Sequence, residues 1–335
     1  MYQLLGICLA LAALLVVNAC ASFIAALVWR VLFVRAQMWR ASTRASVIFA
    51  LRTWPAACAL LCVAALLFPA YFIYEPRASN EAVTTKLALL AALSVFGLTL
   101  AVRRGLGAWW ATHKLIEDWL HHAEPIRLRN VSVPVYRIEH RFPLIAVVGA
   151  FRPRLFVASQ IFDALSDAEL KAALTHEIGH LAARDNLKRT LVRACSDALS
   201  IVPAGRTLGR AWAESAEEAA DEYVARSGGV ASALDLAAAL LKIARMAPHG
   251  MRPATMPAGA FLIGENMDGV AGRVRRLMQL AAVEGASEQH ESSMQRLALW
   301  SCFCSLLALV VSIAASSQML VAMHNFIERI VFMLQ

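Results

Sequence analysis

Apolar residues along this chain gather into long blocks separated by segments of mixed character. The four longest blocks cover residues 4–29, 55–74, 87–102 and 297–323. A hydrocarbon core of ~30 Å needs about 20 residues of helix, and lipid offers no hydrogen-bond partners to exposed backbone. The pattern therefore predicts four transmembrane helices, three before and one after a long middle region.

In the middle region, apolar and polar residues alternate as they do in a water-exposed domain with its own core. β-Branched residues are frequent over 131–139, 145–150 and 154–159, which predicts three short strands. Ser166 and Glu169 have the spacing of a capping box and predict the start of a helix with one apolar face. Further helices are predicted over 186–202, 207–226 and 231–246, and a long loop over 248–268.

Composition and charge support a membrane protein. Hydrophobic residues make up 59% of the 335 positions, charged residues only 17%, and the mean hydropathy is +0.57. A soluble domain is about a quarter charged, so a wholly soluble, disordered or nucleic-acid-binding chain is excluded. The net charge is +8, yet residues 106–296 hold 22 basic and 21 acidic residues. The basic excess therefore lies beside the apolar blocks.

The position of that excess predicts an orientation. The loop between the first two blocks holds five arginines and no acid, and Arg103 and Arg104 follow the third block. Basic loops stay on the cytoplasmic side. We expect a membrane region at 1–105, a cytoplasmic domain at 106–296, and a fourth span with a short tail at 297–335. The N-terminus and the tail then face outward.

One pentapeptide in the middle region carries chemistry. His176-Glu177-Ile178-Gly179-His180 is an H-E-x-x-H sequence inside the helix opened by Ser166. Residues four apart share a helix face, so His176 and His180 can bind one zinc ion. Glu177 is rotated by about 100° from the first histidine and can accept a proton from a water. A solvated helix face with two histidines is the alternative interpretation.

A catalytic zinc needs a third protein ligand, and Glu217 is our candidate. Asp221 lies one turn further on and could accept the N–H of a ligating histidine. By spacing alone, Glu214, Glu218 and Glu222 compete with Glu217 for the ligand role, although we interpret them as surface charge.

These motifs resemble the gluzincin membrane peptidases, and the region around them is similar to the BlaR/MecR-type peptidases, which are multi-pass antirepressor proteases. The resemblance covers about 147–225 and three spans before the domain with one after it. Related HtpX and CaaX-processing peptidases share the motifs with differently placed spans. The matching sequences are VVGAFRPRLFV at 147–157, Leu165-Ser166-x-x-Glu169-Leu170, the H-E-x-x-H motif, Arg184-Asp185-Asn186 and Glu217-x-x-Ala220-Asp221.

The resemblance implies a mainly α membrane protein with four transmembrane helices and a cytoplasmic α+β zincin-like metallopeptidase domain in a bacterial cytoplasmic membrane. His176, His180 and Glu217 would bind one Zn²⁺ per chain, with Glu177 as general base and Asp221 behind the ligands. A strand beside the site would pair with extended substrate. Our candidate for that strand is Ile145, Ala146, Val147, Val148 and Gly149.

The expected activity is that of a zinc endopeptidase acting on a protein or peptide, such as a transcriptional repressor, beside a lipid bilayer. Signalling relatives carry an extracellular drug-binding domain after the last span, whereas only 324–335 follow it here. A sensor would therefore be a separate protein. The alternatives are an HtpX-like quality-control protease and a non-catalytic transducer or scaffold with a structural metal.

Three further features have weaker interpretations. Tyr223 and His249 are possible donors to the reaction intermediate. Arg273, Arg275 and Arg276 form a basic patch, which we interpret as a solvated face or a contact with lipid phosphate. Nucleic-acid binding is not expected, because the domain is nearly neutral.

Overall fold

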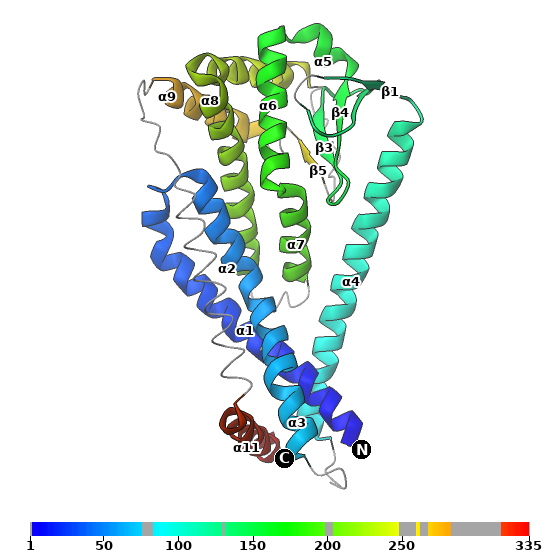
Figure 1. The fold of residues 1–335 in the computed structure, drawn as a ribbon, viewed down its shortest axis with the longest axis vertical. Coiled ribbons are helices and arrows are strands. Elements are labelled where there is room, and N and C mark those ends of the chain that lie inside the picture. The colour runs from blue at the N-terminus through cyan, green and yellow to red at the C-terminus, as the bar shows by residue number, and fades with distance from the viewer. Residues whose placement is uncertain are drawn as a thin grey trace.

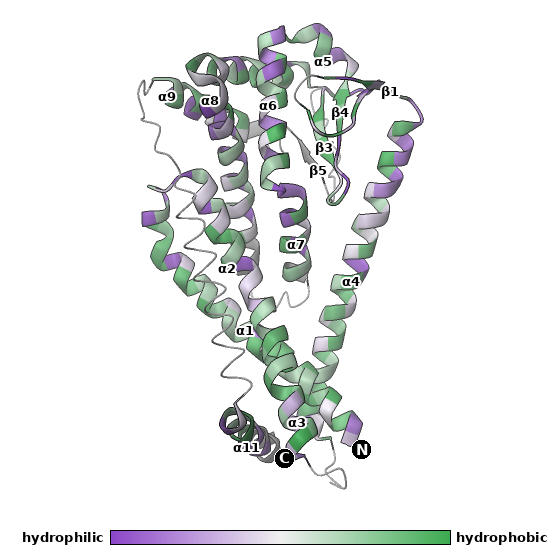
Figure 2. Ribbon diagram, in the orientation of Figure 1, coloured by the Kyte–Doolittle hydropathy of each residue, from purple (hydrophilic) through white to green (hydrophobic). Residues whose placement is uncertain are grey.

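The computed structural model describes residues 2–75, 83–128, 131–197, 204–247, 259–261, 267–282 and 316–334. Long helices converge at one end of the molecule, and a mixed unit of sheet and helices occupies the other end (Figure 1). The narrow end is the more hydrophobic of the two (Figure 2). The protein is therefore mostly helical, with a small sheet at the end away from the apolar helices.

The first three predicted spans lie within helices of membrane length. Each helix is long and apolar enough to cross a bilayer. The helices are α1 (Tyr2–Ala36), α2 (Ala41–Cys62), which continues through a π-helical turn at Val63–Leu67 into α3 (Phe68–Tyr74), and α4 (Thr85–Leu120).

These helices extend well beyond the apolar blocks. Most of the arginine-rich segment expected as a loop is helical, because α1 ends at Ala36 and α2 begins at Ala41. The expectation of a loop was wrong, since residues 30–52 contain neither proline nor glycine to end a helix. The polar beginning of α2 lies against α8 of the mixed unit.

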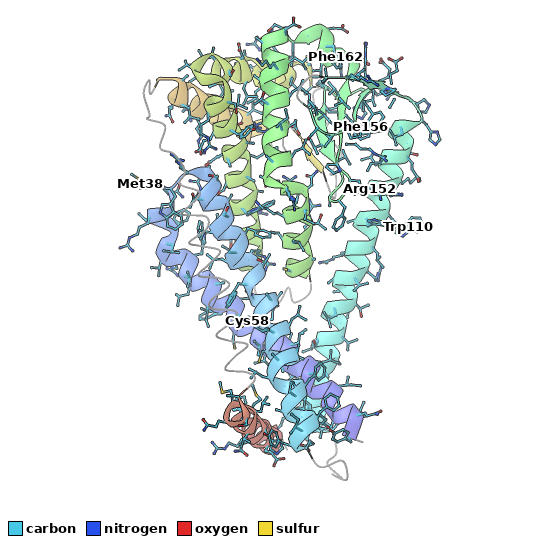
Figure 3. All side chains as sticks on the ribbon, viewed as in Figure 1. Met38, Cys58, Trp110, Arg152, Phe156 and Phe162 are labelled. Atoms are coloured by element: carbon cyan, nitrogen blue, oxygen red, sulfur yellow. The ribbon has the colours of Figure 1, made fainter. Side chains whose placement is uncertain are left out.

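Exposed tryptophans mark the point where α4 leaves the apolar zone. Trp109 and Trp110 are 55% and 68% exposed and follow Arg103 and Arg104. Tryptophan and arginine are both favoured at membrane–water interfaces. Trp110 lies near the level of Arg152, in the turn between two strands of the mixed unit (Figure 3). The mixed unit therefore begins close to the level at which α4 leaves its apolar segment.

The predicted fourth span lies mostly outside the described residues. Its last part opens α11 (Ser317–Leu334), so most of the expected tail is helical. By length and composition, Thr207–Met246 also qualifies as a membrane-length helix. We assign that helix to the mixed unit, because it packs on other helices there and carries the buried carboxylate of Asp221.

The mixed unit contains a five-stranded sheet in the order β1-β2-β4-β3-β5. β2 and β4 are parallel, and the other neighbours are antiparallel. The three predicted strands are confirmed as β2, β3 and β4, whereas β1 and β5 were missed because they are short and lack an alternating pattern. The strands are β1 (Ala123–Ile126), β2 (Val135–Ile138), β3 (Ile145–Val148), β4 (Arg154–Ala158) and β5 (Gly259–Phe261).

Helices complete the unit and enclose its core with the sheet. The capping box of Ser166 and Glu169 is present at the start of α6, and α8 breaks at Gly229, whose φ is +70°. Large buried side chains such as Phe156, Ile161 and Leu240 lie in the core. The helix α9 begins where the predicted loop over 248–268 ends, and no helix was predicted there. The helices are α5 (Ser159–Ala164), α6 (Asp167–Ala183), α7 (Asp185–Asp197), α8 (Ala204–Met246) and α9 (Met267–Ala282).

Candidate metal centre

Helix α6 brings the residues of the H-E-x-x-H motif to the interior of the unit. His176, Glu177 and His180 are 0%, 0% and 2% exposed. The Nε2 atoms of the two histidines are 3.1 Å apart, and their rings meet edge to face. Two imidazoles on one helix face therefore point at a common position, which is not what a solvated helix surface would show.

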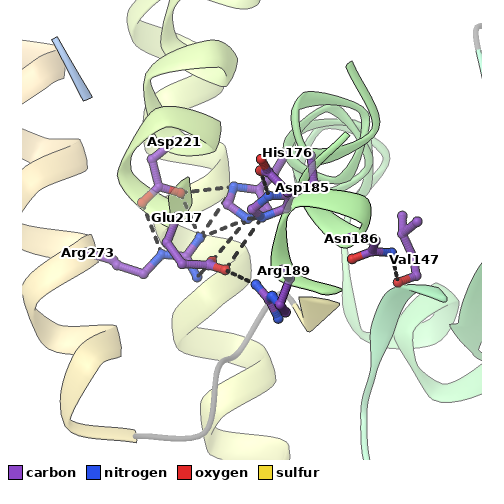
Figure 4. Close-up of polar contacts among 9 residues, drawn as sticks. Val147, His176, Asp185, Asn186, Arg189, Glu217, Asp221 and Arg273 are labelled. Atoms are coloured by element: carbon purple, nitrogen blue, oxygen red, sulfur yellow. Dashed lines mark hydrogen bonds and ion pairs between the residues drawn. The ribbon is translucent and has the colours of Figure 1, made fainter. Parts of the chain in front are cut away.

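Helix α8 adds the carboxylate of Glu217 to this position. Its Oε2 lies 3.6 Å from His176 Nε2, and its Oε1 lies 3.6 Å from His180 Nε2. The close approach of the helices depends on small residues, because a Cβ on Gly179 would lie 3.4 Å from the Cα of Ala220. Glu217 thus reaches both imidazoles from a separate helix (Figure 4).

A second pair of carboxylates lies behind the histidines. Asp221 Oδ1 is 3.0 Å from His176 Nδ1, and Asp185 Oδ2 is 2.7 Å from His180 Nδ1. A carboxylate on Nδ1 holds the proton there and leaves Nε2 free to bind a metal. The two carboxylates therefore favour a proton on Nδ1 of each histidine, and both Nε2 atoms face Glu217.

Asp185 was not identified as a site residue from the sequence. Helix α6 ends at Arg184, whose φ of 54° is left-handed, and this turn places Asp185 at the start of α7 beside His180. A left-handed arginine is unusual, because most helices that end in this way use glycine. The Arg184-Asp185-Asn186 sequence was the available signal, but it does not reveal the turn.

The donor set fits a zinc ion. Tetrahedral zinc with bonds of about 2.0–2.1 Å to nitrogen holds its ligand atoms about 3.3 Å apart. The three pairs of ligand atoms described above are 3.1, 3.6 and 3.6 Å apart, so small side-chain shifts would bring all three atoms to the distances of a zinc site. Two imidazoles and one carboxylate also make a ligand set typical of catalytic zinc, which keeps one position open.

Glu177 provides a second indication of function. Both of its carboxylate oxygens are buried and have no hydrogen-bond partner among the described residues. Burial raises the pKa of Glu177 to about 7, although the neighbouring histidines act in the opposite direction. A buried carboxylate without a partner is costly, and perturbed carboxylates of this kind gather at functional sites. Its pKa suits a base that works near neutral pH.

Arg273 belongs to this centre, which corrects its interpretation as part of a solvated or lipid-contacting patch. It binds Asp221 with Nε at 3.0 Å and Nη2 at 2.7 Å, and its Nη1 lies 3.3 Å from Glu217 Oε2. The guanidinium therefore holds the two α8 carboxylates in place. Arg275 is exposed, as expected of a patch residue.

Two other acids of α8, Glu218 and Glu222, connect this helix to α2 and α9. Glu218 forms ion pairs with Arg44 of α2 and with Arg276 of α9. Glu222 accepts hydrogen bonds from the backbone N–H of Ala41 and from Arg276. Both residues are partly buried, so their interpretation as plain surface charge was incomplete.

The strand expected to bind substrate lies next to the centre. Asn186 donates hydrogen bonds from Nδ2 to the carbonyls of Val147 (2.9 Å) and Gly149 (3.2 Å), which ties β3 to the start of α7. However, β3 lies between β4 and β5. The register pairs Val147 with Ala260, so β5 makes the backbone contacts that we expected from substrate.

Tyr223 and His249 were the candidate donors to the reaction intermediate with the weaker interpretation. Tyr223 packs against Gly179 at the contact of α6 and α8, where a Cβ on Gly179 would lie 3.3 Å from the tyrosine ring. His249 lies outside the described residues. Neither observation assigns a donor.

The fold and the centre define a class of protein. An H-E-x-x-H helix, a carboxylate from a second helix and a small sheet beside them are the elements of a zincin-type metallopeptidase. Residues 144–249 match peptidase family M48, which points to a membrane-associated metallopeptidase hydrolase. The match covers about a third of the chain and includes the centre up to Asp221. A comparison with curated proteins finds no match.

Proposed function

We propose that this protein is a membrane-anchored, zinc-dependent endopeptidase. His176, His180 and Glu217 would hold one zinc ion, and Glu177 would be the general base. The observation that carries the proposal is the meeting of these three ligands beside a buried carboxylate that has no hydrogen-bond partner among the described residues. A structural zinc site would instead be closed and rich in cysteine.

The chain's own residues would perform the proton transfers. When bound, zinc supplies a Lewis acid that polarises the scissile carbonyl and acidifies water. Glu177 would accept a proton from the attacking water and pass it to the departing amine nitrogen. Asp185 and Asp221 would hold the imidazoles through Nδ1, and Arg273 would hold Asp221.

We propose that the peptidase unit, about residues 106–296, faces the cytoplasm. The membrane region (1–105) and the last span with its tail (297–335) would anchor it. The support is the basic segment at the α1–α2 turn and the arginines beside Trp109, both near the unit. Both termini would then face outward.

The substrate would be a protein close to the membrane. Resemblance to BlaR/MecR-type peptidases favours a regulatory repressor, with a separate protein as sensor, whereas an HtpX-like enzyme would remove many damaged membrane proteins. Extended substrate could pair with β3 only where β5 leaves that edge. Comparing protein abundance in cells with active and inactive enzyme separates the two roles, since one substrate or many would accumulate.

The decisive experiment replaces the general base while retaining the ligands. The Glu177→Gln variant should bind zinc normally and lose at least about 100-fold in cleavage of a fluorescent unfolded protein such as casein or of the accumulated substrate. Glu124→Gln, an exposed substitution on β1, is the matched control and should remain active. Undiminished turnover by Glu177→Gln would refute the role of Glu177 as the general base. No cleavage by the unsubstituted, zinc-loaded protein would refute the peptidase proposal and favour a non-catalytic transducer or scaffold.

A further inference from the structure

The turn between β3 and β4 presents an exposed aromatic side chain beside a positive charge. Phe151 is 84% exposed, which is more than any other large apolar side chain that the structure describes in the mixed unit. Its neighbour Arg152 is also exposed and forms no ion pair among the described residues. The turn contains no acidic residue between Gly149 and Arg154. One tip of the unit therefore offers an apolar ring and a guanidinium to a partner outside the chain.

The backbone of this turn is held in a fixed shape. Gly149 adopts a φ of +103°, and a Cβ there would lie 2.9 Å from the carbonyl oxygen of Arg152. Asn186 donates a hydrogen bond to the carbonyl of Gly149 at 3.2 Å, and Pro153 restricts the chain where β4 begins. The exposure of Phe151 is thus not that of a loose loop, because both ends of the turn are fixed.

The turn lies close to the level at which the membrane-length helices leave their apolar segments. Arg152 is near the level of Trp110 on α4, and Met38, in the turn between α1 and α2, lies at a similar level on the opposite side (Figure 3). Met38 and Trp110 are 88% and 68% exposed. Three segments far apart in the sequence thus present large exposed side chains at one level of the molecule, as a membrane–water boundary would favour.

We propose that the β3–β4 turn docks on the membrane surface, with the ring of Phe151 among the lipid headgroups and Arg152 on a lipid phosphate. The proposal rests on the membrane anchoring proposed above and not on peptidase activity. The interface of a bilayer accepts an aromatic ring, and anionic lipids attract a guanidinium. A protein partner would need roughly 800 Å² of surface, whereas an aromatic side chain covers about 150–250 Å². Lipid therefore suits this small tip better than a protein does.

Docking of the turn would fix the position of the metal centre relative to the bilayer. Asn186 ties the turn to the start of α7, where Asp185 contacts His180 at 2.7 Å. The turn also follows directly on β3, our candidate for the substrate strand. The end of that strand would then lie at the membrane surface, next to a substrate that emerges from it.

Photocrosslinking in lipid nanodiscs tests the contact directly. Full-length protein that carries Phe151→p-benzoylphenylalanine is reconstituted in phosphatidylcholine mixed with phosphatidylglycerol, irradiated and analysed by mass spectrometry. We expect a lipid adduct at position 151. The same amino acid at Phe96, which is 63% exposed on the apolar part of α4, is the positive control. At Asp163, exposed on α5 at the far end of the unit, it should give no lipid adduct (Figure 1).

A second substitution tests the charge. One arginine at an anionic surface contributes about a fivefold preference for anionic lipid. Adding Arg152→Gln to the photocrosslinking chain should therefore lower the ratio of phosphatidylglycerol to phosphatidylcholine adducts about fivefold. Lys171→Gln, an exposed change on α6, removes the same charge elsewhere and should leave the ratio unchanged. An unchanged ratio in the Arg152→Gln chain would overturn the contact of Arg152 with phosphate.

The positive control separates failure of this proposal from failure of the membrane anchoring. Lipid adducts at position 96 but not at position 151 would overturn the docking of the turn and leave the proposed function intact. Lipid adducts at neither position would overturn the membrane anchoring of α4 together with the docking. An adduct that joins position 151 to protein alone would also overturn the lipid contact and assign the turn to a substrate or protein partner.

Discussion

The carboxylate of Asp185 offers a sharp test of how the metal centre is built. Asp185 is 6% exposed at its side chain and accepts a hydrogen bond from His180 Nδ1 at 2.7 Å. Asp185 is not one of the proposed zinc ligands. It would affect zinc binding by orienting the imidazole of His180 and by raising the basicity of that ring. Removing it should therefore weaken zinc binding without removing any ligand.

The size of the effect follows from the buried hydrogen bond. A hydrogen bond to a charged group contributes about 1.5–3 kcal/mol. Since 1.4 kcal/mol is a factor of ten in affinity, Asp185→Ala should weaken zinc binding by about 10–100-fold. Carboxylates behind zinc-bound histidines have effects of the same order. Asp185→Asn should lose less, because its amide oxygen can still accept the hydrogen bond.

Competition with a chromophoric zinc chelator measures the affinity. Asp163→Asn, an exposed change on α5, is the control and should bind zinc normally. Circular dichroism verifies that the helices are intact. Equal affinities for Asp185→Ala and the parent chain, within twofold, would refute the role of Asp185.

Three further predictions concern the proton transfer, a turn and a helix contact. Because burial raises the pKa of Glu177 to about 7 and a bound cation lowers it, kcat/KM should fall with decreasing pH at or below pH 7; an acid limb above pH 8 would contradict this. Gly149→Ala should lower the free energy of unfolding by about 1–3 kcal/mol in thermal denaturation, because the φ of Gly149 is +103° and the new Cβ would lie 2.9 Å from a backbone oxygen. Gly272→Ala on α9 places its Cβ in open space and should leave the free energy of unfolding unchanged. A double-mutant cycle of Arg44→Ala and Glu218→Ala should give a coupling free energy of about 0.5–3 kcal/mol in unfolding. If the effects of the two substitutions are additive, this ion pair does not stabilise the contact between α2 and α8.

Local spacing was enough to predict the first part of the centre. His176, Glu177 and His180 lie on one helix, and positions four apart share a face whatever surrounds the helix. The capping box of Ser166 and Glu169 likewise acts within a single turn and is present. The first three membrane-length helices followed from hydropathy, because the length of an apolar block is also a local property.

Contacts between segments far apart in the sequence could not be predicted from local spacing or hydropathy. Arg273 reaches Asp221 because α9 packs on α8, which no pattern within α9 reveals. β5 occupies the edge of β3 from a segment that resembles a loop in sequence. The five arginines between the first two apolar blocks looked like loop residues, although four of them lie within α1 or α2, because the chain there contains no proline or glycine.

The sequence by itself determined the apolar helices, the capped helix and the pair of histidines, since each depends on residues within a few positions of one another. Only the tertiary structure decided which acid of α8 faces the histidines, because Glu217 reaches them through the close contact of Gly179 with Ala220. It also decided the partner of His180, which is Asp185 beyond a left-handed turn. The physical reason is that helix periodicity orders neighbours along one axis, whereas packing sets the rotation and distance between two axes.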